Sequence, residues 1–397
     1  MPLPARREYL KVMHQRYLKA HSRAEKARII EEVMATLGYH RKYAIMVLRH
    51  PPADKPKRAG RHRKQKYLDA LPVIRLVWEA LDYPCAERLK PVLLETAQLL
   101  ASHGELTLTE KLEADLSSIS RATLARRIKE WPSPKPKRAL KRHDTGLKAE
   151  IPIGRLPWNE SKPGALLADL VEHNGGSSLG HFAYTLSLAD IVTGYSRRIA
   201  FLGRGQQTVF TALRSLLATW PTSVHSLQTD NGAEFLNNHL AAFAKENNIA
   251  FFRSRPYKKN DNAYIEQKNR QFVREIVGYA RYDTPEEVAW LNQVYAILDP
   301  YANLFLPMRK VVEKSYAGGR LKKKFDDAKT PFRRLKESGA LTPQAEKVLT
   351  TKHASLNPLR LHQELERLLG QGPPPASLRE AGALGLDLLM SDPLLVR

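Results

Sequence analysis

The sequence has 397 residues and a hydrophobic content of 43%, enough for two or more domains, each with its own core. Lys and Arg number 64 against 41 Asp and Glu, and the formal charge of +23 favours a polyanionic partner, with nucleic acid the first candidate. The single cysteine, Cys85, excludes a disulfide framework or a zinc cluster, and no apolar run is long enough for a membrane span. We therefore expect a cytoplasmic protein associated with nucleic acid.

Residues 1–50 are predicted to form a helix-turn-helix DNA-binding domain. An S-x-x-E capping box at Ser22 opens a helix with an apolar stripe, and Gly38 is expected to end it. A short basic helix follows from His40 to Arg49. Helix, glycine turn and basic helix is the helix-turn-helix pattern, although an ordinary helical hairpin with a solvated basic face has the same pattern. The candidate DNA contacts on the basic helix are Arg41 and Lys42.

A second helical domain of the helix-turn-helix type is predicted over residues 67–131. The stretch 51–66 before it is rich in proline and basic residues, which indicates a linker or an arm that contacts phosphates or the minor groove. Ser120 is expected to cap a recognition helix, with Leu124 and Ile128 facing inward. The candidate DNA contacts on this helix are Arg121, Arg126 and Arg127.

A second basic, proline-rich linker is predicted over 132–160, and strand patterns begin after it. The expected order is strands at 165–173, 182–190 and 196–202, helix 206–220, strand 224–229, helix 237–247, strand 249–253 and helix 263–277. This order predicts an α/β layer with a mixed sheet. Thr284, Pro285 and Glu287 provide the cap, first-turn proline and capping-box glutamate of a further helix.

Residues 309–397 are predicted to be a small basic β/α region that serves DNA binding or assembly. The glycine pair Gly318–Gly319 lies between two short strand-like runs and predicts a hairpin. Asn357 and Pro358 predict the start of a short helix that ends at Gly370. The apolar C-terminus indicates a tail or a docking segment.

Two acidic residues of the α/β region are candidates for chemistry. Asp230 directly follows an apolar strand, which places its carboxylate at the carboxyl edge of a sheet, where α/β folds locate their sites. An Asn-Gly pair follows it, so a simple turn is the alternative. Glu266 lies on a predicted helix and shares a face with Asn269 and Arg270; here the alternative is a solvated helix face.

The spacing of these two residues, together with the sequence around them, resembles the pattern of a known protein family. Thirty-five residues separate Asp230 from Glu266. The segment TDNGAEF surrounds Asp230, and the segment KKNDNAYIEQKNR leads into the helix of Glu266. The sequence resembles the DDE integrase and transposase superfamily over about residues 161–308, and it is most similar to bacterial insertion-sequence transposases. The resemblance implies a ribonuclease H-like catalytic core, with a mixed five-stranded sheet, over 161–308.

The family requires one further aspartate, on the first strand of its sheet. Asp169 fits, because it lies in an apolar run where a carboxylate would be costly without a partner, and metal ions would be that partner. The competitor is Asp190 on the second strand. In the family, an aspartate at that position commonly supports the turn and does not bind metal.

The resemblance implies a two-metal phosphoryl transfer with Mg²⁺, for which Mn²⁺ can substitute. Asp169 would bridge two ions, with Asp230 on one and Glu266 on the other. The enzyme would cut DNA strands at the ends of a mobile element and join them to target DNA, as at least a dimer on duplex DNA. The catalytically inactive DNA-binding protein and the nuclease without joining activity are the alternatives. Further candidate DNA contacts are Lys258, Lys259, Lys268, Asn269 and Arg270.

Overall fold

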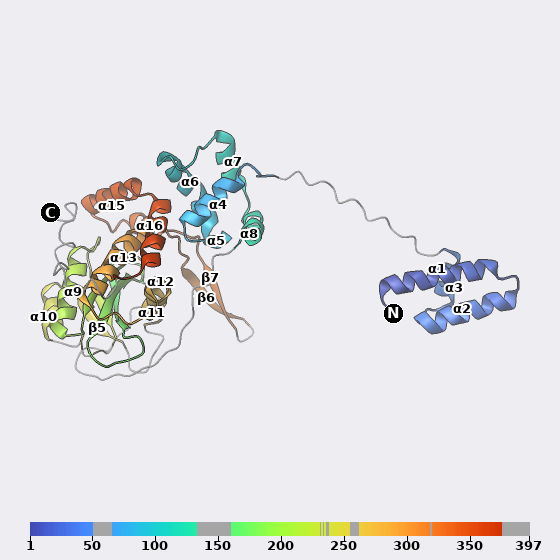
Figure 1. Ribbon diagram of the computed structural model, residues 1–397, viewed down its shortest axis with the longest axis horizontal. Helices are drawn as coiled ribbons and strands as arrows, with labels where there is room; N and C mark the ends of the chain where they lie inside the picture. The colour runs from blue at the N-terminus through green and yellow to red at the C-terminus, as the bar shows by residue number, and fades with distance from the viewer. Residues whose placement is uncertain are drawn as a thin grey trace. The chain divides into compact units, whose positions relative to one another are not determined.

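The computed structural model describes residues 1–50, 66–132, 160–230, 232, 234–235, 238–254, 262–317 and 320–374. The chain divides into two units, Met1–Lys66 and Tyr67–Arg397 (Figure 1). Both predicted linkers, apart from their end residues, lie outside the described residues. In the described part of the chain, no helix has the length and apolar character needed to cross a membrane.

The described part of the first unit folds into helices α1 (Leu3–Lys19), α2 (Arg23–Leu37) and α3 (Arg41–Arg49). The predicted capping box is confirmed, because the Glu25 backbone N–H donates to Ser22 Oγ at 3.0 Å and the Glu25 carboxylate accepts from the Ser22 N–H at 3.3 Å. Gly38 ends α2 with a φ of +67°, a conformation that favours glycine. The three helices share one small core, formed by Leu10, Met13, Ile29, Ile30, Val33, Ala44, Val47 and Leu48.

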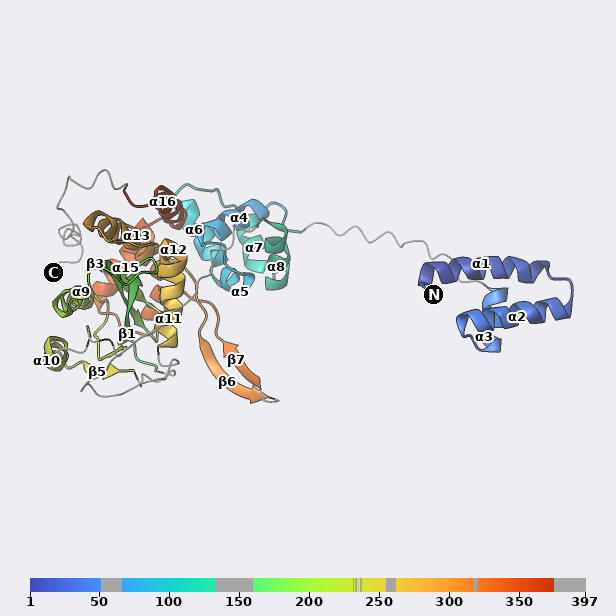
Figure 2. The same ribbon diagram turned by 60° about the horizontal axis from the view of Figure 1, so that its bottom comes forward.

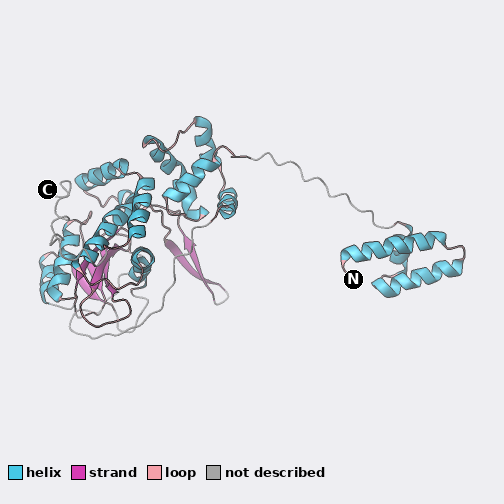
Figure 3. Cartoon of the chain, in the orientation of Figure 1, coloured by secondary structure: helices cyan, strands magenta, loops and turns pink. Residues whose placement is uncertain are grey.

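A five-stranded mixed sheet lies at the centre of the second unit (Figure 3). Its order is β3-β2-β1-β4-β5; β1 pairs antiparallel with β2 and parallel with β4. The prediction of a mixed sheet is confirmed, and so is the order of its elements. The strands are β1 (Ala165–His173), β2 (Ala183–Asp190), β3 (Ser196–Leu202), β4 (Ser226–Thr229) and β5 (Ala250–Arg253).

Alternate residues of β1 are buried on opposite faces of the sheet, as strand geometry requires. Leu166 and Ala168 belong to the cluster on one face, with α9 (Gln206–Ala218) and α10 (Asn238–Glu246). Ala165 and Leu167 lie on the other face with Ile265. That residue belongs to a helix built in three parts, namely α11 (Ala263–Asn269), the π-helical turn η3 (Arg270–Arg274) and α12 (Glu275–Val277). Because Asp169 has the parity of Ala165 and Leu167, it faces α11.

Helix α13 (Pro285–Leu304) covers the open edge of the sheet at β3. The predicted cap is present, since Thr284 and Glu287 form a capping box. Amide and carboxylate side chains of α13 bond to the backbone of alternate residues of β3. These bonds join Asn303 to Ser196, Asp299 to Arg198 and Asn292 to Ala200, at 2.7–3.0 Å. The edge strand therefore presents satisfied rather than free backbone groups on that side.

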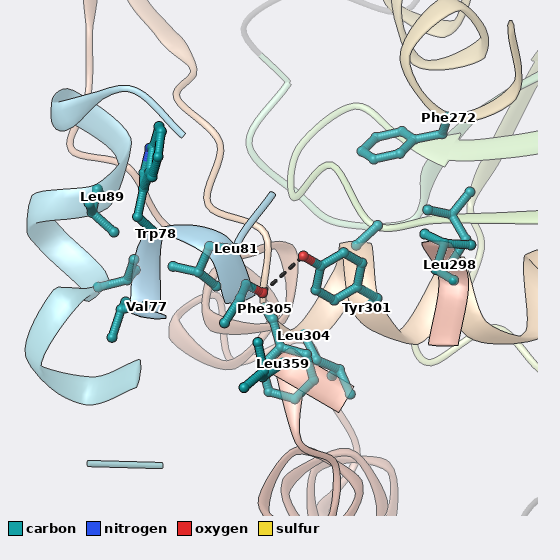
Figure 4. Packing of buried hydrophobic residues seen from close by; sticks show 14 of the residues in the cluster. Val77, Trp78, Leu81, Leu89, Phe272, Leu298, Tyr301, Leu304, Phe305 and Leu359 are labelled. Carbon is teal, nitrogen blue, oxygen red and sulfur yellow. Dashed lines mark hydrogen bonds between the residues drawn. The ribbon is translucent and has the colours of Figure 1, made fainter. Parts of the chain in front are cut away.

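The helices between residues 67 and 131 pack into the same hydrophobic cluster as α13 and the C-terminal helix α16 (Pro358–Gln371) (Figure 4). The Tyr301 hydroxyl of α13 donates to Ala80 O at 2.9 Å, which connects α13 to the end of α4 (Leu71–Ala80). The sequence predicted separate domains over 67–131 and 161–308; in the structure they share this core. The helices are α4 (Leu71–Ala80), α5 (Ala86–Leu89), η1 (Lys90–Val92), α6 (Leu93–Ser102), α7 (Glu110–Ser118) and α8 (Arg121–Glu130).

After α13 the chain forms the predicted hairpin, β6 (Val311–Ala317) with β7 (Arg320–Phe325), which is a two-stranded sheet of its own (Figure 2). Three helices follow: α14 (Pro331–Glu337), α15 (Pro343–Ser355) and α16 (Pro358–Gln371). The predicted helix start at Asn357 is confirmed, because its side chain accepts from the Leu359 and Arg360 N–H groups. The apolar C-terminal segment lies outside the described residues.

Candidate active site

Three carboxylates predicted from the sequence lie on adjoining elements of the sheet and its covering helix. Asp169 lies on β1, Asp230 directly follows β4, and Glu266 lies on α11. Since β1 and β4 are parallel neighbours, with Leu167 opposite Gln228, continuing the register two residues along brings Asp230 beside Asp169. The negative charges of Asp230 and Glu266 both act on Asp169, so the three side chains share one electrostatic environment.

The surroundings of Asp169 disfavour the ionised form of its carboxyl group. Burial, followed by the charges of Asp230 and Glu266, raises the pKa of Asp169 to about 8. A hydrogen bond from Asn269 Nδ2 to Asp169 Oδ2, at 2.8 Å, works in the opposite direction. Asn269 is only 5% exposed, and its own Oδ1 is buried without a hydrogen-bond partner. Asn269 therefore orients the Asp169 carboxylate from a buried position, while its own Oδ1 accepts no hydrogen bond.

Asp230 begins the turn that follows β4. Its Oδ1 accepts a hydrogen bond from the Gly232 N–H at 3.0 Å, so the turn reading of the Asp-Asn-Gly sequence is also correct. Burial raises the pKa of Asp230 to about 6, against the lowering effect of that bond. The Asp230 carboxylate therefore shapes the turn while it lies beside Asp169 at the end of β4.

A buried hydrogen-bond network fixes the start of α11 against the ends of β4 and β5. The Gln228 side chain donates to Ser254 Oγ at 3.1 Å and to Asn262 Oδ1 at 3.3 Å. Ser254 Oγ also donates to Thr229 O at 2.9 Å and contacts Asn262 Oδ1. Asn262 is the residue before α11, so this network sets where Glu266 lies relative to Asp230.

The three carboxylates suit a divalent cation, both in the type of ligand atom that they offer and in their negative charge. Its donors are oxygens only, the ligands that Mg²⁺ prefers. A cation would also offset the mutual repulsion that raises the pKa of Asp169. Among the described residues, no three His, Cys, Asp or Glu side chains lie close enough together to hold one ion between them.

Asp190, the competitor for the first-strand position, has a different environment. Its oxygens accept from the N–H groups of Gly164, Val192 and Thr193 at 2.5–2.8 Å and from Thr193 Oγ1 at 3.1 Å. It therefore holds the turn after β2 together, while burial raises its pKa. These contacts are those expected of a turn-supporting aspartate.

Lys268 is buried, in contrast to the expectation that it would contact DNA. It is 7% exposed, and its ammonium donates to Gly194 O at 3.0 Å. Burial, with the charge of Arg198 next, lowers its pKa to about 7. The reason lies in helix geometry, because Lys268 is three residues beyond Ile265 and shares its inward face.

The other predicted DNA contacts divide into exposed, paired and undescribed residues. On α3, in the first unit, Arg41 and Lys42 are exposed. On α8, Arg121 and Arg126 are exposed, Arg127 is half-buried and pairs with Glu130 at 3.1 Å, and Leu124 and Ile128 pack inward as predicted. Arg270 is exposed and pairs with Glu275 at 3.2 Å, whereas Lys258 and Lys259 lie outside the described residues.

Two features around the site were missed by the sequence reasoning. Arg274, on the π-helical turn, lies near enough for the charges of Glu172 and Asp169 to act on it. Such π-helical turns often occur at functional sites, but their position follows from packing and has no local sequence signal. Gln228 was not singled out either, although it lies on β4 only two residues before Asp230.

His173, at the end of β1, is fully buried. Its Nε2 lies 2.8 Å from Thr185 Oγ1, which in turn contacts the Tyr295 hydroxyl at 2.8 Å. Burial lowers the pKa of His173 to about 3, so the ring is neutral and links β1 to β2 and α13.

Comparison with known proteins gives one informative relative. No protein-family model matches the sequence. The chain is similar to the uncharacterized protein y4rM of Sinorhizobium fredii (strain NBRC 101917 / NGR234). The two are 33% identical over 337 residues, which cover 84% of this chain and 95% of y4rM.

Proposed function

This chain belongs to the same family as y4rM, and we propose that it is a DNA transposase of the DDE type with a ribonuclease H-like catalytic core. It would bind the ends of a mobile element, hydrolyse strands there and join the freed 3′-hydroxyls to target DNA. The observation that carries the proposal is the convergence of Asp230 and Glu266, separated by 35 residues, on the partly buried Asp169.

The site would hold divalent cations through the oxygens of Asp169, Asp230 and Glu266. Two Mg²⁺ ions, when bound, supply a clamp for the attacking and leaving oxygens of an in-line phosphoryl displacement. Asn269 would keep the Asp169 carboxylate oriented through its 2.8 Å hydrogen bond. The Gln228, Ser254 and Asn262 network would hold the Glu266 helix at a fixed distance from Asp230.

The substrate would be double-stranded DNA, both as element ends and as target. The formal charge of +23 supports a polyanionic partner. Exposed basic residues on α3 and α8 are placed on helices that follow a short turn, as in helix-turn-helix proteins. These residues would bind the element ends, and at least two copies of the chain would be needed to bring two ends together.

The test is strand transfer on DNA that carries the element's own ends, in the presence of Mg²⁺ or Mn²⁺. Joined molecules from the wild-type protein, and none from Asp230→Asn, are the expected products. Cleavage without joining would favour a nuclease of the same fold. DNA binding without cleavage in either metal would favour a protein that has lost catalysis, and full activity of Asp230→Asn would refute the assignment.

A further inference from the structure

The β6–β7 ribbon (residues 311–325) is strongly basic and contains none of the candidate site residues. It holds five lysine or arginine residues and one acidic residue, Glu313. Lys322, Lys323 and Lys324 are consecutive on β7, and all three are exposed. Because neighbouring side chains of a strand point to opposite faces, this triplet makes both faces of the ribbon cationic.

Apolar side chains of the ribbon are also left in solvent. Val312 is 53% exposed and Phe325 is 42% exposed, with the Arg309 guanidinium 5.0 Å from the Phe325 ring. An isolated two-stranded ribbon gains little stability from its own contacts. Cations on both faces, with exposed apolar groups beside them, suit a surface that is completed by a polyanion with apolar parts of its own.

The base of the ribbon is firmly attached. Asp326, directly after β7, accepts from the Lys310 N–H at 2.7 Å and from the Arg334 guanidinium at 2.6 Å. The Lys310 ammonium donates to Val192 O, in the turn that Asp190 holds. The same turn accepts the bond from Lys268 of α11 at Gly194 O. The ribbon is thus connected, through one turn, to the helix that bears Glu266.

We propose that the β6–β7 ribbon is a DNA-binding element that lies in a groove of the duplex next to the site of cleavage. The inference rests on the proposed function for the identity of the nucleic acid. Two strands about 4.8 Å apart fit the major groove of B-DNA, which is about 12 Å wide and is known to accept such ribbons. The lysines on the two faces would then meet phosphates on both sides of the groove.

The competing explanation is that the lysines only prevent the ribbon edges from pairing with other chains. Charge reversal separates the two explanations, since glutamate also keeps an edge charged. The variant Lys322→Glu/Lys323→Glu leaves Lys324 in place, because Lys324 lies opposite Glu313 and its ammonium is 3.6 Å from that carboxylate. The matched control is Arg214→Glu/Lys347→Glu, two exposed cations on α9 and α15.

Binding to duplex DNA is measured for both variants as a function of salt. If the two lysines each contact a phosphate, their reversal lowers affinity by at least about 10-fold near 0.1 M salt and reduces the slope of log K against log salt by about 2. The control changes the net charge equally, so its affinity should stay within about 3-fold of the wild type. A ribbon variant that matches the control in affinity and slope would overturn the proposal.

Cross-linking locates the contact. In a Cys85→Ser background, a Ser315→Cys variant places a thiol at an exposed position of the ribbon, and Ser355→Cys places one at the exposed end of α15. Duplex DNA that carries an activated disulfide should exchange with the first thiol, releasing the leaving-group thiol and forming a protein–DNA disulfide, and should not exchange with the second. Equal cross-linking at both positions, or at Ser355→Cys alone, would contradict the assignment.

These measurements are independent of catalysis. Ribbon-dependent binding by a protein that neither cuts nor joins DNA would support the ribbon and reject the proposed chemistry. Strand transfer by a wild-type protein whose binding does not depend on the ribbon would support the proposed chemistry and reject the ribbon as a DNA-binding element. A wild-type protein without affinity for duplex DNA would reject both.

Discussion

Two aspartates on neighbouring strands, Asp169 on β1 and Asp190 at the end of β2, have opposite environments. Burial raises the pKa of both carboxyl groups. Around Asp190, four donors from Gly164, Val192 and Thr193 occupy both carboxylate oxygens. Around Asp169, the contact from Asn269 is accompanied by the negative charges of Asp230 and Glu266.

This difference separates an acid that supports a turn from the one that we propose binds metal. A buried carboxylate surrounded by N–H and O–H donors has its charge compensated by the protein itself. A carboxylate placed beside two others has a negative charge that the protein itself does not compensate. Groups with such uncompensated charges are concentrated at functional sites.

Replacement of Asp169 should abolish catalysis without a cost in stability. We expect Asp169→Asn to lower strand transfer by at least about 1,000-fold, or about 4 kcal/mol, because a metal-binding oxygen is lost. Its thermal unfolding midpoint should equal or exceed that of the metal-free wild type, since the variant removes a carboxyl group whose ionisation is opposed by burial and by the charges of Asp230 and Glu266. A stable variant with normal strand transfer would show that Asp169 is not part of the site.

Replacement of Asp190 should have the converse result. Asp190→Ala leaves several buried N–H groups of the turn unsatisfied, and we expect a loss of about 3 kcal/mol in the free energy of unfolding. The control is Asp69→Ala, which removes an exposed ion pair with Lys111 and should cost less than about 1 kcal/mol. Chemical denaturation measures both, and equal losses would refute the supporting role of Asp190.

The neutral, buried His173 should make stability depend on pH. Its folded pKa, about 3, is below the ordinary value of 6.5, so between these limits the unfolded chain binds a proton that the folded chain does not. Stability should therefore fall as pH decreases through this window, by up to about 1.4 kcal/mol per pH unit.

The groups that face His173 are the Thr185 hydroxyl, the Tyr282 ring at 5.4 Å and the charge of Arg274. His173→Gln keeps a polar partner for Thr185 and removes the titration. Between pH 7 and pH 5 this variant should lose about 2 kcal/mol less stability than the wild type. Parallel pH profiles of the two proteins would be incompatible with a buried neutral histidine.

The smallest effect is expected at Lys268. Because its ammonium is buried against Gly194 O, Lys268→Met should leave DNA affinity and its salt dependence unchanged. The exposed neighbour Arg270 provides the comparison, and Arg270→Gln should reduce the salt slope by up to about 1. A loss of affinity in Lys268→Met as large as in Arg270→Gln would restore the original expectation for Lys268.

Local sequence patterns predicted the helices and strands whose boundaries depend on nearby residues. Strands β1 and β3 begin and end where their apolar runs predicted, and the capping boxes at Ser22 and Thr284 start their helices as expected. Helices α14 and α15 were not predicted individually. Their caps, Thr330 and Thr342, each precede a proline, so a local signal for both was present in the sequence.

The features that the sequence did not predict depend on contacts between distant residues. Asn292, Asp299 and Asn303 are ordinary helix positions until β3 lies beside them, about 100 residues away in the chain. The network of Gln228, Ser254 and Asn262 likewise needs three elements in place. Lys268 shows a different error, because its spacing from Ile265 already placed it on the inward face while its charge suggested an exposed position.

The most direct test of the central claim is metal binding by the three carboxylates as one site. Mn²⁺ binding, measured by electron paramagnetic resonance in the presence of duplex DNA, should be present in the wild type. It should be lost in each of Asp169→Asn, Asp230→Asn and Glu266→Gln, and kept in Asp190→Asn at a temperature where that variant is folded. Unchanged Mn²⁺ binding in the three carboxylate variants, or loss only in Asp190→Asn, would contradict the account.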